Sequence, residues 1–183
     1  AEEQVNMVWT LVSAAFIFFM EAGFFLLEAG GLAKKNHKNV IITNILSCIT
    51  ALFGFWLTGF AFGFSPKGNP FIGGDARYFA GKGFEDVETD QAASFFFQFA
   101  FSTTTTSIVS GCLFERSPTH VILGYCLFLS MFVYPVVTAW CWNANGWLYE
   151  QGYHDFAGTG CIHLTAGIGG LIGAAFTGKR FLK

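Results

Sequence analysis

Three ionisable residues lie inside long apolar stretches of this chain: Glu21, Glu28 and His163. A charged side chain at the centre of a bilayer costs about 3 kcal/mol or more, so such residues usually face protein or a water-filled cavity and mark a path for an ion or a proton. These three side chains are therefore the first candidates for chemistry.

The two glutamates differ in depth. Glu28 lies at the end of its apolar stretch, where it can reach interfacial water or pair with Lys34 or Lys35, which predicts a structural role. Glu21 lies two helical turns deeper and must face protein or a cavity, either neutral or hydrogen-bonded. Helix packing and a functional role fit Glu21 equally well.

His163 lies roughly one turn into the last apolar stretch. Small residues beside an intramembrane histidine allow either the close packing of another helix or a narrow lumen lined by the imidazole. The G-x-x-x-G spacing of Gly169 and Gly173 favours packing for the neighbouring stripe, and a hydrogen-bonded core histidine is the alternative for His163. On a regular helix the face of His163 continues through small residues, Ala166, Gly167, Gly170 and Ala174.

Aromatic residues suggest cation binding. Phe97 and Phe101 are one helical turn apart and share a face, and Trp142 ends a later apolar stretch within a group of Trp and Tyr residues. A desolvated aromatic face attracts a small cation by about 0.5 to 2 kcal/mol, and Trp is the best such ring. Lipid-facing packing and an interfacial aromatic belt are the alternative explanations.

Asp155 precedes the last apolar stretch. Asp is a strong helix N-cap, and a carboxylate is favoured at the positive end of the helix dipole, so a capping role alone explains it. The same carboxylate can also help to hold a cation at an outer vestibule. The sequence leaves both roles open.

The composition describes the surroundings of these residues. The 183 residues are 53% hydrophobic and only 12% charged, with a mean hydropathy of +0.50. This excludes disorder and free solubility, and it predicts an integral membrane protein in a lipid bilayer. The net charge is −2 and no basic face is visible, so nucleic acid is not expected as a partner.

The cysteines and histidines do not form a metal-binding pattern. No C-x-x-C pair occurs, and no histidine lies at metal-ligand spacing from a cysteine, so the five cysteines are expected to be small buried hydrophobes. A haem-ligating histidine pair and a nucleotide-binding loop are also missing from the sequence. We therefore expect no metal, no cofactor and no enzymatic activity.

Apolar windows define the expected helices. A spanning helix needs roughly 20 predominantly apolar residues, and the chain offers about five such windows. Barrel-type alternation is absent, which predicts an all-α polytopic membrane protein with a single transmembrane domain over residues 1–183. Residues 65–90 are rich in Gly and are expected to form an outer loop. The expected spans are 7–30, 40–64, 91–114, 119–142 and 159–178.

The basic residues predict an orientation. They favour one side of the expected spans, so the positive-inside rule places the N-terminus outside and Lys183 inside. Glu2 and Glu3 replace the basic region of a signal peptide, which indicates a processed or truncated chain. Seven of the ten basic residues lie on the expected inner side: Lys34, Lys35, Lys38, Arg116, Lys179, Arg180 and Lys183.

Several ordered blocks resemble one known family, the ammonium transporters (Amt/Rh), on the Amt side. No single block is decisive, but together they run in family order from end to end of the chain. The blocks are MEAGFFLLEAG (20–30), KNHKNV (35–40), FFQFAFST (96–103), IVSGCLFER (108–116), YPVV (134–137), Trp142 with GWL (146–148), DFAG (155–158), HLTAG (163–167) and GKR (178–180).

The resemblance implies eleven transmembrane helices, built as two inverted five-helix repeats and one further helix, usually assembled as homotrimers. This chain resembles the first repeat only. By the family pattern His163 looks like the first of two pore histidines and Phe101 like an outer gate ring. Trp142 would belong to the external cation-recruitment site, Asp155 would lie beneath it, and Gln98 would pack around it. Phe97, which shares the face of Phe101, joins this group.

The chain departs from the family pattern at two places. Glu21 stands where Amt proteins more often have Gln, which adds a charge beside the core. Asn143-Ala-Asn145 replaces a glycine-rich run, so the outer mouth is expected to have a different shape.

The implied mechanism captures ammonium on aromatic faces, removes its proton because a dry lumen penalises the cation, and conducts ammonia past the histidines. One hypothesis makes this chain the N-terminal half of such a transporter, in the plasma membrane by resemblance. The other makes it a truncated, non-transporting structural subunit that pairs with other membrane subunits, in which case an organellar membrane fits equally.

Overall fold

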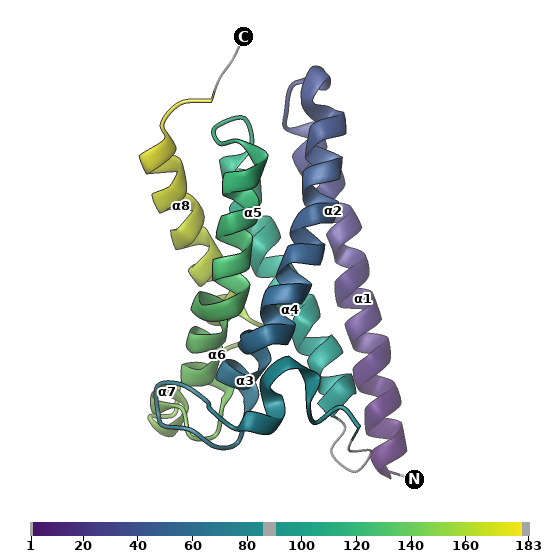
Figure 1. Cartoon of the computed structure of the whole chain (residues 1–183), viewed down its shortest axis with the longest axis vertical. Coiled ribbons are helices and arrows are strands. Elements are labelled where there is room, and N and C mark those ends of the chain that lie inside the picture. The colour runs from purple at the N-terminus through teal and green to yellow at the C-terminus, as the bar shows by residue number, and fades with distance from the viewer. Residues whose placement is uncertain (1, 86–90, 181–183) are drawn as a thin grey trace.

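The structure is a computed structural model that describes residues 2–85 and 91–180. Its helices run along one long axis, with the start of α1 at one end of the bundle and the end of α8 near the other (Figure 1). The described residues contain an isolated bridge between Gly68 and Gly73 but no strand, so the prediction of an all-α fold is confirmed. The loop residues 86–90 and Lys183, which entered the predictions, lie outside the described residues.

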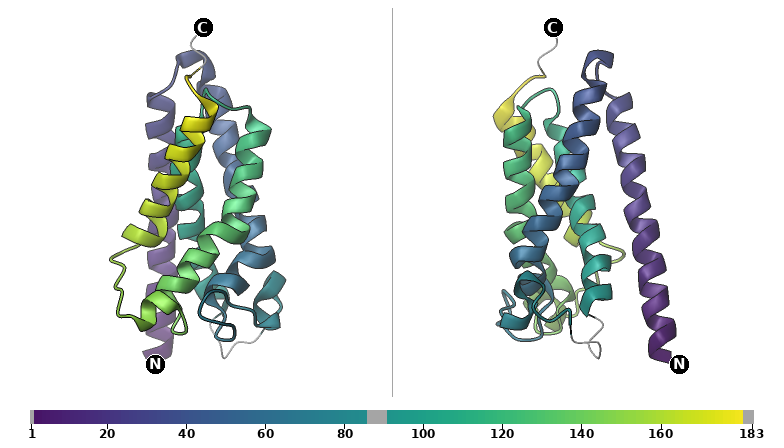
Figure 2. Two further views of the ribbon diagram at one scale, coloured as in Figure 1. Left: turned by 90° about the vertical axis from the view of Figure 1, so that its left-hand side faces the viewer. Right: turned by 45° about the vertical axis from the view of Figure 1, so that its right-hand side comes forward.

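The first two long helices form a hairpin. α1 (Glu2–Gly30) is continuous, and a short 3₁₀ turn (Lys34–Asn36) leads into α2 (His37–Gly54). A π-helical turn (Phe55–Gly59) joins α2 to α3 (Phe60–Phe64) without a break in direction. Figure 2 shows α1 at the edge of the bundle, and its packed face lies against α4.

The segment from α5 to α6 has the same order of α-helix, π turn and α-helix as the segment from α2 to α3, and we call these two segments the rods. α5 (Thr119–Phe128) passes through a π-helical turn (Leu129–Val133) into α6 (Tyr134–Trp142). Pro135 lies in the first turn of α6, and a proline inside a helix lacks an N–H and clashes with the carbonyl four residues earlier. The π turn is the type of local adjustment that relieves this conflict.

The remaining helices complete the bundle. α4 (Gln91–Leu113) packs against α1, α2, α5 and α8 and is therefore the central helix. α7 (Trp147–Glu150) is one turn long, a 3₁₀ segment covers Ala76–Gly81, and a π-helical turn (Thr159–Leu164) precedes α8 (Thr165–Thr177).

Four helical segments are long and apolar enough to span a membrane: Glu2–Gly30, Lys34–Phe64, Thr119–Glu150 and Thr159–Thr177. α4, which the sequence counted as a fifth apolar window, is not among them. It carries a run of six Ser and Thr residues from Ser102 to Ser107, all buried, which lowers its hydropathy. Thr103 and Thr105 donate to carbonyl oxygens of the preceding turn at 2.8 and 2.9 Å, whereas the buried Ser102 Oγ has no partner among the described residues.

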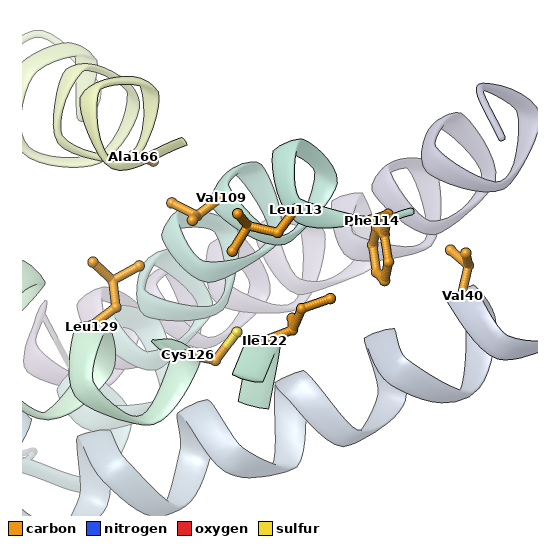
Figure 3. Close-up of a cluster of buried hydrophobic side chains, with 8 residues drawn as sticks. All are labelled: Val40, Val109, Leu113, Phe114, Ile122, Cys126, Leu129 and Ala166. Carbon is orange, nitrogen blue, oxygen red and sulfur yellow. The ribbon is translucent and has the colours of Figure 1, made fainter. Parts of the chain in front are cut away.

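Two buried clusters hold the helices together. Near the hairpin of α1 and α2 the cluster is mainly aliphatic and joins α2, α4, α5 and α8 (Figure 3). Toward the other end the second cluster is mostly aromatic and surrounds Tyr134, whose side chain is fully buried. Its members are Phe55, Phe60, Phe95, Phe99, Tyr134, Cys141, Cys161 and Ile162.

The turns near the hairpin are joined by Glu115, between α4 and α5. Its carboxylate accepts hydrogen bonds from Asn36 Nδ2 at 2.7 Å and from the Ala33 amide at 3.0 Å. These bonds favour the charged form, and the Asn36 amide in particular lowers the pKa of Glu115. The contact fixes the α4–α5 turn against the α1–α2 turn.

The two π turns meet where Gly59 faces the α5–α6 rod. A Cβ atom at Gly59 would lie closer than van der Waals contact to the Ser130 carbonyl oxygen and 2.7 Å from the Phe55 ring. Thr58 Oγ1 donates to the Met131 carbonyl at 3.0 Å in the same contact. The backbones of both rods therefore touch at this glycine.

We expect Gly59→Ala to lower the free energy of unfolding by about 1 to 3 kcal/mol, because the added methyl group overpacks this contact. The measurement is thermal unfolding in detergent. Gly124→Ala on α5 is the matched control, because a Cβ atom there meets nothing within 4 Å. Equal unfolding temperatures for the two variants would contradict the close contact.

Candidate functional site

Asp155 connects α6 to the segment that begins the last helix. Trp142 Nε1, at the end of α6, donates to Asp155 Oδ2 at 3.0 Å. Asp155 Oδ1 accepts from the Gly160 amide at 2.6 Å. The helical segment begins at Thr159 and its N-cap residue is Gly158, so Asp155 is not the N-cap, although its carboxylate binds an amide of the first turn. Both carboxylate oxygens are engaged in positioning.

The predicted aromatic residues lie in contact with one another. The ring centroids of Phe97 and Phe101 are 5.1 Å apart, and those of Phe101 and Trp142 are 5.9 Å apart, both edge-to-face. All three rings are half-buried. We call Phe97, Phe101 and Trp142 the aromatic trio. The ring centroid of Phe64, a residue that the sequence did not single out, lies 6.5 Å from that of Trp142, so Phe64 packs beside the indole.

His163 lies in the π-helical turn and is exposed on the surface of this chain. Its imidazole has no hydrogen-bond partner among the described residues, so both alternatives for His163, the lining of a lumen and a hydrogen-bonded core histidine, stay predictions. The same turn carries Gly160, which is bound to Asp155, so one short segment positions both His163 and the contact with Trp142.

The predicted small-residue face of His163 holds only in part. Gly167 is exposed with His163 and Ala174 is half-buried, whereas Ala166 and Gly170 are buried and Gly170 packs against Cys112 of α4. His163 lies in a π turn, which has more residues per turn than an α-helix, so the α-helical spacing is not fully kept from this residue onward. Gly169 and Gly173, expected to pack, lie against Tyr125 and Leu113.

The Asn143-Ala-Asn145 stretch anchors the loop that follows α6, beside Trp142. Asn143 Nδ2 donates to the Ser65 carbonyl at 2.8 Å, and Asn145 Nδ2 donates to the Pro66 carbonyl at 2.9 Å. These bonds tie the end of α6 to the end of α3. The asparagines that depart from the family pattern therefore shape the connection beside Trp142.

One acidic loop residue near this end, Asp75, is already paired. Asp75 Oδ2 lies 3.3 Å from Arg77 and 3.7 Å from Lys67. The hydrogen bond from the Arg77 amide is the main cause that lowers the pKa of Asp75. Asp75 is thus a loop-stabilising residue. Gln98, expected to pack around the site, is half-buried on α4, and its Oε1 has no donor among the described residues.

The two glutamates of α1 lie near the other half of the bundle. Glu21 is 3% exposed and accepts from Thr104 Oγ1 at 3.1 Å and from Ser107 Oγ at 2.6 Å. Glu28 accepts from Asn44 Nδ2 at 2.6 Å. Within the described residues neither carboxylate is in an ion pair, so the expected pairing of Glu28 with a lysine is wrong. Its partner comes from α2, which the sequence did not indicate.

Comparison with known proteins identifies relatives over nearly the whole chain. Residues 8–183 match the family model described as Ammonium Transporter Family. Ammonium transporter 1 member 3 of Solanum lycopersicum is 38% identical over 97% of this chain and 40% of its own length. Putative ammonium transporter 1 of Caenorhabditis elegans is 37% identical over 99% of this chain and 35% of its own length.

Solved structures agree with these relatives. The protein described as Sensor Amt Protein has a TM-score of 0.89 and 29% identity, over 97% of this chain and 45% of its own. Mep2 of Saccharomyces cerevisiae has a TM-score of 0.81 and 28% identity, over 96% of this chain and 41% of its own.

The chain spans about two fifths of the length of the curated relatives that it matches. The match lies along all of its helices, and the apolar helices together with the family make it an integral membrane protein. By sequence and by fold, this chain belongs to the ammonium transporter family.

Proposed function

We propose that this chain forms the N-terminal half of the pore of an ammonium transporter. The observation that carries the proposal is the aromatic trio, with Trp142 fixed by Asp155 at 3.0 Å. Aromatic rings attract a small cation most strongly where water is excluded, and the half-buried trio offers such a surface. Ammonium is the cation that the relatives' names indicate.

The steps follow from the cost of moving a charge out of water. Ammonium binds at the trio, and a narrow apolar lumen penalises the ion much more than neutral ammonia. The proton is therefore lost near the mouth, and ammonia continues past His163. The imidazole can accept or donate a hydrogen bond on this path. Asp155 acts through Trp142 and the last helix and is a positioning residue.

The exposure of His163 supports the role of a half-pore. A polar imidazole facing lipid is unfavourable, so further protein is expected to cover it. In the family pattern a second inverted repeat supplies that cover together with a second histidine, and three such proteins assemble as a homotrimer. The distribution of basic residues orients the N-terminus outside and Lys183 inside, with the plasma membrane as the expected location.

A second candidate is a truncated, non-transporting structural subunit of a larger membrane complex. The wide apolar surface favours it, because α1 and α8 expose large side chains such as Trp9, Phe19, Leu171 and Phe176. Lipid contact accounts for much of this surface in either case. The contact of Trp142 with Asp155 and Phe101 favours the first candidate, which we therefore prefer.

Asp155→Asn tests the positioning of Trp142. Trp142 Nε1 and the Gly160 amide bind different oxygens of Asp155, and in Asn one of these positions is an NH2 donor, so one of the two bonds is lost. We expect the apparent KM for ammonium to rise about tenfold, equivalent to roughly 1.4 kcal/mol, in uptake by the complete natural protein. Asp75→Asn, in a loop ion pair, is the matched control and should leave KM unchanged.

The double variant separates positioning from direct binding. If Asp155 acts through Trp142, adding Asp155→Asn to Trp142→Ala should leave the KM of Trp142→Ala unchanged. A further tenfold rise in KM would contradict action through Trp142 alone and would assign a role to the Gly160 bond or to direct contact of Asp155 with the cation. An unchanged KM in Trp142→Ala alone would remove the trio from recruitment.

His163→Ala tests the pore assignment. Because the imidazole would line the ammonia path, its removal should lower ammonium flux by about tenfold and alter the pH dependence of that flux. Flux is measured in cells that lack other ammonium transporters. His154→Ala, an exposed loop variant, is the control. A flux and a pH profile identical to the wild type would place His163 outside the pore.

A further inference from the structure

A hollow of about 400 Å³ opens between α1 and α4 at the end of the bundle that carries the α1–α2 hairpin. Its polar lining comes from Glu28, Ser107 and Arg180, and the rest of the wall is mostly apolar. Gly111 also lines it, and a Cβ atom there would lie 2.8 Å from Glu28 Oε1. The absence of that side chain leaves space beside the carboxylate.

The second buried carboxylate is linked to this hollow through Ser107. Ser107 Oγ donates to Glu21 Oε2 at 2.6 Å, and the same residue lines the hollow with Glu28. Glu21 and Glu28 are seven residues apart on α1, or about 10 Å along the helix. Neither has an ion-pair partner in the part of the chain that the structure describes.

The groups around Glu28 offer more acceptors than donors. Asn44 Nδ2 donates to Glu28 Oε2, while Asn44 Oδ1, in a residue only 1% exposed, has no donor. Glu28 Oε1, which faces the hollow, also receives no hydrogen bond from the described residues. An unsatisfied buried polar atom costs about 1 to 3 kcal/mol, so this region favours a ligand that brings donors.

Charge indicates what kind of donor-bearing ligand fits. Glu28 lies in the last turn of α1, where the helix dipole favours a positive charge. Arg180 is the cation in the lining, and it donates to the Gly31 carbonyl at 3.3 Å instead of pairing with Glu28. Glu28 and Arg180 are the ionisable residues of the lining, and because Arg180 binds the Gly31 carbonyl, the Glu28 carboxylate is left for a ligand. Ca²⁺ requires six to eight oxygen ligands, so a monovalent cation fits better.

We infer that the hollow beside Glu28 binds one small monovalent cation that carries N–H or O–H donors, of the ammonium class. Glu28 supplies the charge, and Asn44 holds the carboxylate. The site lies at the opposite end of the bundle from the aromatic trio (Figure 1). The inference rests on the contacts of Glu28 and does not require that Trp142 recruits ammonium, so the two sites can be tested separately.

The test is protection of Glu28 from dicyclohexylcarbodiimide, which labels carboxyl groups in apolar surroundings, in the complete natural protein in detergent. The extent of labelling is read by peptide mass spectrometry in choline chloride, ammonium chloride and sodium chloride of equal ionic strength. With ammonium at about ten times its Kd, mass action predicts labelling of Glu28 lowered by about tenfold. The exposed Glu85 should stay essentially unlabelled in all three salts, which checks that labelling reports an apolar environment.

Two variants sharpen this test. Gly111→Ala places a methyl group 2.8 Å from Glu28 Oε1 and should abolish protection by ammonium. Asn44→Leu removes the amide that holds Glu28 and should weaken protection by ammonium. This second variant keeps the test decisive if Gly111→Ala does not fold. Trp142→Ala should keep full protection, so failure of the outer site leaves this result intact. Equal labelling in ammonium and choline, or equal protection by sodium, would overturn the inference.

Discussion

The carboxylate of Asp155 is the contact on which the arrangement of the outer site depends. It accepts from the indole of Trp142 at one oxygen and from the Gly160 amide at the other. One side chain therefore fixes the end of α6 against the start of the last helical segment. The ring of Trp142 is then placed edge-to-face with Phe101, and the turn that carries His163 is held at the same point. Bonds to a charged carboxylate are stronger than bonds between neutral groups, which suits a junction between two helices.

The polar character of α4 supports this arrangement from the centre of the bundle. Its four consecutive buried threonines, Thr103 to Thr106, donate to carbonyl oxygens of the preceding turn, and Thr104 and Ser107 supply two donors to Glu21. Such a helix is stable in a membrane only when other helices surround it. The aromatic trio and the Glu28 hollow lie at opposite ends of the same helix, since Phe97 and Phe101 belong to its first half and Gly111 to its last turn.

The sequence predicted the order and class of the elements because apolar windows and family blocks are spread along the whole chain. It also predicted that Phe97 and Phe101 share a face, which their contact confirms, because both lie in an uninterrupted α-helix. Their roles in recruitment stay predictions. The α-helical period held only in part at His163, which lies in a π turn, since Gly167 is exposed with it but Ala166 and Gly170 are buried.

Sequence patterns did not predict side-chain contacts between residues that are far apart in the chain. Glu28 has lysines nearby in the chain, yet its partner is Asn44, sixteen residues away on the next helix. The packing of Phe64 against Trp142 and the close contact at Gly59 likewise depend on the α2–α3 segment lying against the α5–α6 segment. Pro135 was the one local signal of the π turn before α6, since a proline inside a helix forces such an adjustment.

The central claim, that this chain is one half of a transport pore, is tested most directly by the intact mass of the natural polypeptide, isolated from its membrane without proteolysis. The account predicts more than twice the 20.1 kDa of this chain, with a second intramembrane histidine in the additional sequence. A mass of 20.1 kDa would contradict it and favour the structural-subunit alternative.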